Sequence, residues 1–292
     1  MTAVWALTWK ELIRKRVTMM TAVMTVLFWI AYWFVAAAIA SETNSIVTTG
    51  IQVNVLEKYT ISAMVLTIGF FFGAFAVAFL SIFSSVSAVT GEAETGVLQS
   101  VLSRPIKRWH WFLGRWLGFV SYGVLYGIIL FVTIILICKI ETGVLFEGIV
   151  LLKSFALFVS VVPLLVSITM LGSCWLGPLG NGIGMTMLFG MGWLGSTIGR
   201  FMSESMIERE GIKTLETITG LIQLAMPADA LQQRMLGELF SIAELSGLFN
   251  LNRAHSYFAI GAIPSNTFLV YSALYTAIML LAGLLVLRKK DF

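Results

Sequence analysis

Residues 116–138 read WLGFVSYGVLYGIILFVTIILIC, and no residue in this stretch is charged. An α-helix needs about 20 predominantly apolar residues to cross the hydrocarbon core of a bilayer, because each residue adds only about 1.5 Å. The stretch is long enough to span a membrane as a single helix. It therefore predicts that the chain is an integral membrane protein.

Five further stretches share this length and apolar character. They cover residues 18–40, 60–88, 154–176, 179–199 and 267–287, and none contains Asp, Glu, Lys, Arg or His. The whole 292-residue chain is 58% hydrophobic and 12% charged, with a mean hydropathy of +0.92. Soluble domains are nearer about 45–50% apolar and about 25% charged. These features predict an all-α membrane protein with six transmembrane helices in a single domain over residues 1–292.

Glycine and cysteine positions give expectations about packing. Residues 177–182 read GPLGNG and predict the break between the fourth and fifth spans, since Pro and Gly interrupt helices. Cys138 and Cys174 lie far apart near span ends, so a structural role is predicted for both. Four G-x-x-x-G pairs predict close helix packing inside the subunit, with dimerisation or gating as the alternative. The pairs are Gly69 and Gly73, Gly114 and Gly118, Gly123 and Gly127, and Gly195 and Gly199.

The distribution of Lys and Arg predicts the orientation of the chain. If both termini are cytoplasmic, the inner segments hold 11 of the 19 basic residues and only four acidic ones. Short cytoplasmic loops of membrane proteins carry an excess of Lys and Arg. Both termini are therefore expected on the cytoplasmic side.

The absence of charge within the spans bears on how the protein is powered. Ionisable residues inside a membrane usually mark ion paths, proton relays or binding sites. Their absence disfavours an ion-coupled carrier, and no G-x-x-x-x-G-K-[ST] sequence is present to cradle the phosphates of ATP. No Ser-His-Asp, paired-carboxylate or metal-ligand pattern occurs either. Energy for uphill transport would have to come from another polypeptide.

The predicted inner loop between the second and third spans has a pattern of its own. Residues 91–108 read GEAETGVLQSVLSRPIKR, in which two acidic residues precede an apolar face at helical spacing. Acidic residues suit the start of a helix, and Pro105 would end it. This pattern predicts a short amphipathic helix at the cytoplasmic surface. The alternative is a basic loop that only follows the topology rule.

The first 17 residues, MTAVWALTWKELIRKRV, resemble an interfacial helix. Trp5 and Trp9 would serve as aromatic anchors, and the basic residues 14–16 would form its edge. The alternative is a plain topology anchor.

The predicted outer segment, residues 200–266, is the least regular part of the chain. It begins with charged residues and becomes amphipathic over residues 215–236. A structural cap over the span ends is the favoured interpretation, and a gate or exit for substrate is the alternative.

The loop motif also carries a family resemblance. Glu92, Gly96, Leu102, Pro105, Ile106, Arg108, Gly114 and Arg115 fit the signature E-x-x-x-G-T-x-x-x-L-[LS]-x-P-[IV]-[ST]-R-x-x-x-[LIV]-G-[KR]. This signature is similar to that of the type-2 ABC exporter permeases. Lys107 and Val97 depart from it, so the signature does not identify the subfamily. The N-terminal Trp-Lys-Glu at residues 9–11, the six spans and the closing RKKDF extend the resemblance along the chain.

The resemblance implies the membrane-spanning, non-catalytic subunit of an ATP-driven exporter in a prokaryotic plasma (inner) membrane. It implies a dimer with a second copy or a homologous permease, and nucleotide-binding subunits that hold ATP and Mg; no nucleic acid is expected to bind. Residues 1–17 would be the elbow helix, residues 91–108 the coupling loop, and the region around Pro227 an extracellular re-entrant hairpin. The residues expected at the ATPase contact are Glu92, Glu94, Thr95, Gly96, Leu98, Leu102, Arg104, Pro105 and Arg108 in the loop, with Lys10, Glu11, Arg14 and Arg16 in the elbow helix.

Two other function classes are consistent with the same sequence. One is a mechanical transducer, in which the same assembly works on an extracellular partner. The other is a membrane-embedded enzyme acting on lipid-linked substrates, which would need an acidic or His constellation that the sequence does not display. Relatives handle ions, drugs, peptides, lipids and polysaccharides, and apolar spans do not choose among these substrates.

Overall fold

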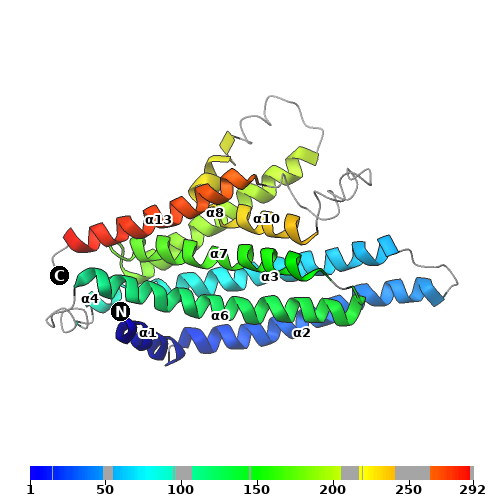
Figure 1. Cartoon of the computed structure of the whole chain (residues 1–292), viewed down its shortest axis with the longest axis horizontal. Coiled ribbons are helices and arrows are strands. Elements are labelled where there is room, and N and C mark those ends of the chain that lie inside the picture. Colours follow the sequence, from blue (N-terminus) through cyan, green and yellow to red (C-terminus); the bar gives the residue numbers. More distant parts are fainter. Residues whose placement is uncertain are drawn as a thin grey trace.

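The computed structural model describes residues 1–14, 16–48, 55–94, 96, 107–144, 146–204, 217–218, 220–240 and 264–289. The regular elements within these ranges are helices, and the long ones run side by side as an elongated bundle (Figure 1). Their bounds are α1 Thr2–Arg14, α2 Arg16–Thr48, α3 Val55–Ser85, α4 Thr90–Glu94, α6 Arg108–Thr142, α7 Gly148–Gly172, α8 Pro178–Glu204, α10 Ala228–Leu239 and α13 Asn266–Lys289.

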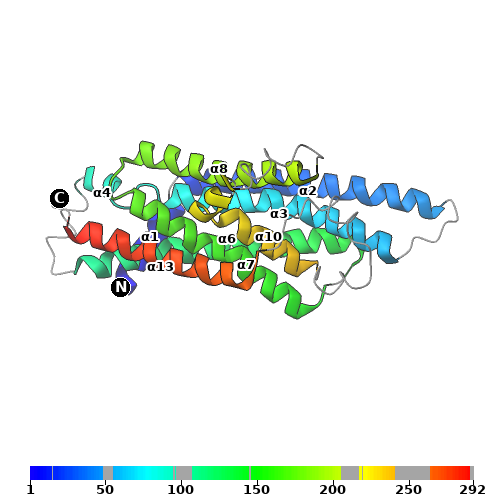
Figure 2. The ribbon, with the colours of Figure 1, turned by 90° about the horizontal axis from the view of Figure 1, so that it is seen from above.

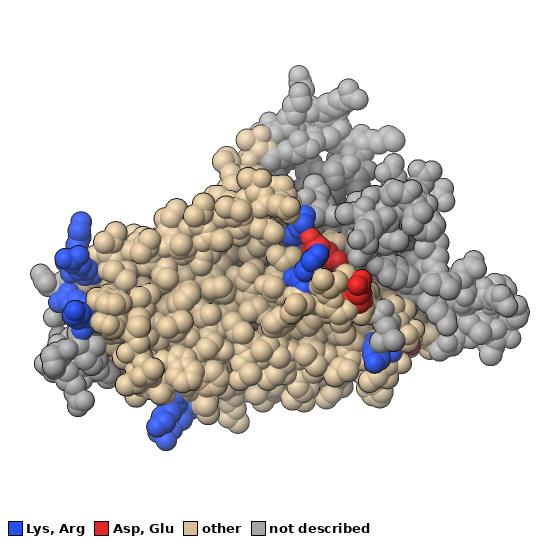
Figure 3. Space-filling view, viewed as in Figure 1, with Lys and Arg blue, Asp and Glu red and all other residues tan. Residues whose placement is uncertain are grey.

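One end of the bundle gathers α1, α4, the start of α6 and the end of α13 (Figure 1). We call this the terminal end, and the opposite end the outer end. On the face drawn in Figure 3, Lys and Arg gather at the terminal end, and a mixed basic and acidic group lies toward the outer end. Mostly uncharged surface separates them, as expected for a band that contacts hydrocarbon.

Five helices are long and apolar enough to cross a membrane. They are Thr18–Ser41, Ile61–Glu94, Arg108–Thr142, Gly148–Gly172 and Asn266–Lys289. The remaining predicted span, residues 179–199, does form a helix, α8, but α8 is not among the five. Seven of its residues are glycine, which lowers its apolar character below that of the helices in the five candidate spans. The fold is therefore an all-helical membrane bundle, with five candidate spans in the described part of the chain.

The centre of the bundle is built from α3, α6 and α7. The buried rings of Phe70, Phe131 and Phe158, one from each helix, have centroids 5.2–5.9 Å apart. Six of the eight G-x-x-x-G glycines lie against a side chain of another helix of the same chain, which confirms the prediction of internal packing for these three pairs. Both cysteines are free and buried, consistent with a structural role.

The described part of the predicted outer segment contains a helical hairpin. A short helical stretch, residues 220–225, leads to Met226 and Pro227, and α10 follows. We call residues 220–239 the outer hairpin. It packs beside α7 and α8 within the length of the bundle (Figure 2). Asp229, in the first turn of its helix α10, is buried. The proline-separated pair of short helices agrees with the hairpin that the family resemblance implies; residues 205–216, 219 and 241–263 lie outside the described residues.

Candidate functional site

The predicted contact residues that the structure describes lie at the terminal end. Thr95 and residues 97–106, which include Leu98, Leu102, Arg104 and Pro105, lie outside the described residues, and so does most of the predicted coupling helix. The described members belong to α1, the beginning of α2, α4 and the segment that follows it, and the first turn of α6. The site can therefore be built from the elements at either end of the loop.

Two glycines allow α1 to lie directly on α6. A Cβ atom added at Gly114 would come within 2.9 Å of the Val4 Cβ, and one added at Gly118 would come within 2.7 Å of the Thr8 Cβ. These separations are shorter than carbon atoms tolerate, so a larger residue would force the helices apart. The glycine pair therefore determines where the N-terminal helix docks.

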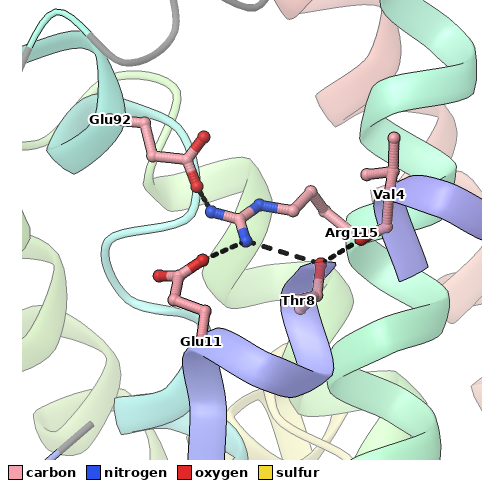
Figure 4. Close-up of polar contacts among 5 residues, drawn as sticks. All are labelled: Val4, Thr8, Glu11, Glu92 and Arg115. Atoms are coloured by element: carbon pink, nitrogen blue, oxygen red, sulfur yellow. Dashed lines mark hydrogen bonds and ion pairs between the residues drawn. The ribbon is translucent and has the colours of Figure 1, made fainter. Parts of the chain in front are cut away.

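Arg115, the residue after Gly114, holds two other elements (Figure 4). Its guanidinium forms ion pairs with Glu11 of α1, at 2.5 Å, and with Glu92 of α4. It also donates to the Thr8 hydroxyl at 3.4 Å, and that hydroxyl donates to the Val4 carbonyl at 2.9 Å. A planar guanidinium carries several N–H groups in fixed directions, so one arginine can bind two carboxylates at once. Arg115 thus joins α1, α4 and α6.

Burial makes this cluster sensitive to the loss of a partner. Arg115 is only 2% exposed, and the rings of Trp111 and Phe119 lie 5.8 Å and 5.6 Å from its guanidinium carbon. A buried charge is costly unless it is paired, and removing one partner of a buried pair typically costs about 3–5 kcal/mol. The side chain of Glu92 is 14% exposed and that of Glu11 is 36% exposed. Water therefore screens the Glu11 pair more than the Glu92 pair.

The short helix α4 is also attached to the turn between α7 and α8. The backbone N–H of Thr90 donates to the Ser173 carbonyl at 3.2 Å, and its hydroxyl donates to the Leu176 carbonyl at 2.8 Å. Gly96 follows with φ of 72°, a left-handed conformation that favours glycine after a helix. Glu92 and Glu94 thus belong to a short helix that ends before Gly96. The sequence analysis instead placed these acidic residues at the start of the longer amphipathic helix.

Arg108 begins α6 and points to the last turn of α13. Its Nη1 donates to the carbonyls of Leu287 and Arg288, both at 3.4 Å. The last carbonyls of a helix have no N–H partner within the helix, and a cationic side chain there is favourable. Arg108 therefore caps α13, a contact that the loop motif does not reveal.

The elbow-helix residues divide into two groups. Lys10, Arg14 and Arg16 are exposed, whereas Glu11 takes part in the Arg115 cluster. The indole N–H groups of Trp5 and Trp9 both donate to the Ser121 hydroxyl of α6, at 2.9 Å and 2.7 Å. The predicted aromatic anchors thus fasten α1 to α6.

Arg115 was missing from the predicted contact residues, although it matched the family signature. Its partner Glu11 lies 104 residues away in the sequence. The sequence does offer one signal. Arg115 is a single charged residue between Gly114 and Gly118 in the chain, and small residues let another helix approach closely. Among the described residues, no group of three or more His, Cys, Asp or Glu side chains could hold a metal ion.

Comparison with known families identifies the class of protein. A family model described as ABC-2 family transporter protein matches residues 3–292. The chain belongs to the ABC-2 transporter family. No curated protein matches the chain. Family membership confirms the resemblance of the loop motif and makes the protein a multi-pass ABC transporter permease. In the part of this ABC-2 permease that the structure describes, the cluster around Arg115 joins three helices at the terminal end.

Proposed function

We propose that this ABC-2 permease is the non-catalytic membrane subunit of an ATP-driven exporter. It would work as a dimer, in a prokaryotic plasma membrane, with separate nucleotide-binding subunits that hold ATP and Mg²⁺. The observation that carries the proposal is the Arg115 cluster, in which one buried guanidinium binds carboxylates from α1 and α4.

The cluster lies at the terminal end, where a nucleotide-binding subunit would contact the permease and move it. The terminal end is rich in Lys and Arg, which favours a cytoplasmic location. In the chain, the predicted coupling loop joins α4 to α6, and both of these helices take part in the Arg115 cluster. A push on this loop would therefore act on α1, on α3 through α4, and on α6. Several helices would move together, as a change of access across a bundle requires.

The outward face of α8 supports a dimer. Gly180 and Gly184 have no atom of another residue within 4 Å of an added Cβ, beyond the neighbours within their own helix. Ile183, Met187 and Met191 are more than half exposed on the same helix. Small residues four apart let helix backbones approach closely in membranes. This open, glycine-containing face is suited to a second permease copy.

The proposal is tested by reconstitution with an ATPase. The tagged chain would be co-expressed with candidate nucleotide-binding subunits of its own genome and purified into lipid nanodiscs. A stable complex whose ATPase rate depends on the permease is the expected result. Glu92→Gln should lower that stimulation several-fold, whereas the same substitution at the exposed Glu147, just before α7, should leave it near the native value. Failure of every candidate subunit to associate would count against the function itself.

A further inference from the structure

The turn of the outer hairpin is held by two tyrosines of α13. The Tyr271 hydroxyl donates to the Leu224 carbonyl at 2.7 Å, and the Tyr275 hydroxyl donates to the Ala225 carbonyl at 2.8 Å. These carbonyls end a helical stretch, so they have no N–H partner within it. Leu224 and Ala225 are exposed on the bundle surface, where hydrocarbon offers no replacement donor. The two hydroxyl groups therefore stabilise this turn.

The turn lies partway along the length of the bundle rather than at its outer end. Tyr275 is nine residues from the first residue of α13, which corresponds to about 14 Å along the helix. A further contact lies nearer the outer end, where Arg234 of α10 donates to the Pro264 carbonyl and to the Asn266 side chain, both at 3.0 Å. Helix α13 thus contacts the hairpin at two depths.

The other end of α13 is fastened to α6. Arg108 caps its last carbonyls, as described above. A Cβ added at Gly283 would come within 2.8 Å of the Phe112 ring, so α13 and α6 are pressed together there. Figures 1 and 2 both show α13 running beside α7 between the hairpin and the terminal end. Helix α13 therefore joins Arg108, the last residue of the predicted coupling loop, to the turn of the outer hairpin.

We propose that α13 transmits movement of Arg108 to the outer hairpin, and that Tyr271 and Tyr275 are the positioning residues that keep the hairpin turn closed. Because α13 is continuously hydrogen-bonded, a displacement at its capped end is carried along its axis to the tyrosines. Breaking the two hydroxyl–carbonyl bonds frees the turn and opens the outer end. The inference rests on the proposed function, in which the ATPase subunit supplies the displacement.

The test measures coupling between the two ends in the permease alone. Hydrogen exchange of residues 220–231 would be followed by mass spectrometry in lipid nanodiscs. Arg108→Gln should raise exchange in the hairpin about threefold or more, and so should the pair Tyr271→Phe with Tyr275→Phe. The matched control is Lys107→Gln, since Lys107 is the exposed neighbour of Arg108, and it should have no effect.

Combining the variants tests whether Arg108 acts on the hairpin through the two tyrosines. On the double-phenylalanine background, Arg108→Gln should add no further increase, because the link that carries its effect is already absent. An unchanged hairpin in Arg108→Gln, a fully additive effect, or an equal rise throughout α7 would each overturn the inference. No ATPase is needed, so this result is independent of complex formation. If Arg108→Gln leaves hydrogen exchange of the hairpin unchanged while the native permease stimulates the ATPase, only the role of α13 is refuted.

Discussion

The terminal end and the outer hairpin are both held by side-chain hydrogen bonds, but with different chemistry. At the terminal end a cation binds two carboxylates, whereas the hairpin turn is held by neutral hydroxyl groups donating to carbonyls. Ion pairs are tolerated near the membrane edge, where water and headgroups lower the free energy of a charged side chain. Deeper in the bilayer a neutral bond satisfies the backbone without that cost. The difference implies that the terminal end is the more stable of the two regions. The turn of the outer hairpin should open with a smaller input of free energy.

The largest effect is expected from removing the cation. Arg115→Met would leave the buried Glu92 carboxylate without its partner and should destabilise the protein by about 3–5 kcal/mol. Arg115→Lys should recover only part of this loss, because an ammonium group cannot bridge both carboxylates as a guanidinium does. Thermal unfolding in nanodiscs would measure both variants. Equal stability of Arg115→Met and the native protein would contradict the central role of the cluster.

The next effect should come from overfilling the contact between α1 and α6. Gly118→Ala places a Cβ 2.7 Å from the Thr8 Cβ and should cost about 1–3 kcal/mol, together with displacement of α1. Gly148→Ala is the matched control, because no neighbouring atom lies within 4 Å of its added Cβ. Accessibility of a cysteine introduced on α1 would report the displacement. An identical response from the two variants would show that α1 is not docked through Gly118.

The two carboxylates should differ in importance. Glu92→Gln should cost about 1.5–3 kcal/mol, the usual worth of a hydrogen bond to a charged group. Glu11→Gln should cost less than about 1 kcal/mol, since its side chain is 36% exposed and the pair is screened by water. Comparing the two unfolding midpoints tests this order. A larger loss in Glu11→Gln would mean that α1, rather than α4, depends most on Arg115.

The smallest effect on global stability is expected at the outer hairpin. Tyr271→Phe and Tyr275→Phe should each cost about 0.6 kcal/mol, the average for polar side-chain contacts between membrane helices. Their signature should be local, with faster exchange in residues 220–231 and little change in the unfolding midpoint. A loss as large as that of Arg115→Met would remove the contrast between the two ends.

The sequence predicted the membrane bundle well because hydropathy is a local property. It also located the terminal end, since Lys and Arg concentrate in the segments that meet there. The Arg115 cluster could not be predicted, because Glu11 lies 104 residues away and only the packing of α1 on α6 brings the two together. Only the family resemblance indicated the hairpin, because the tyrosines that hold its turn, Tyr271 and Tyr275, lie 47 and 50 residues further along the chain than their partners.

The glycine pair that receives α1 has a consequence for how this surface changes in evolution. Gly118 and Thr8 occupy one shared volume, as do Gly114 and Val4, although about a hundred residues separate the members of each pair in sequence. A gain of one methyl group on α6 must be matched by a loss on α1. Among relatives, an alanine at position 118 should therefore accompany a smaller residue at position 8, so that each pair is inherited as a unit.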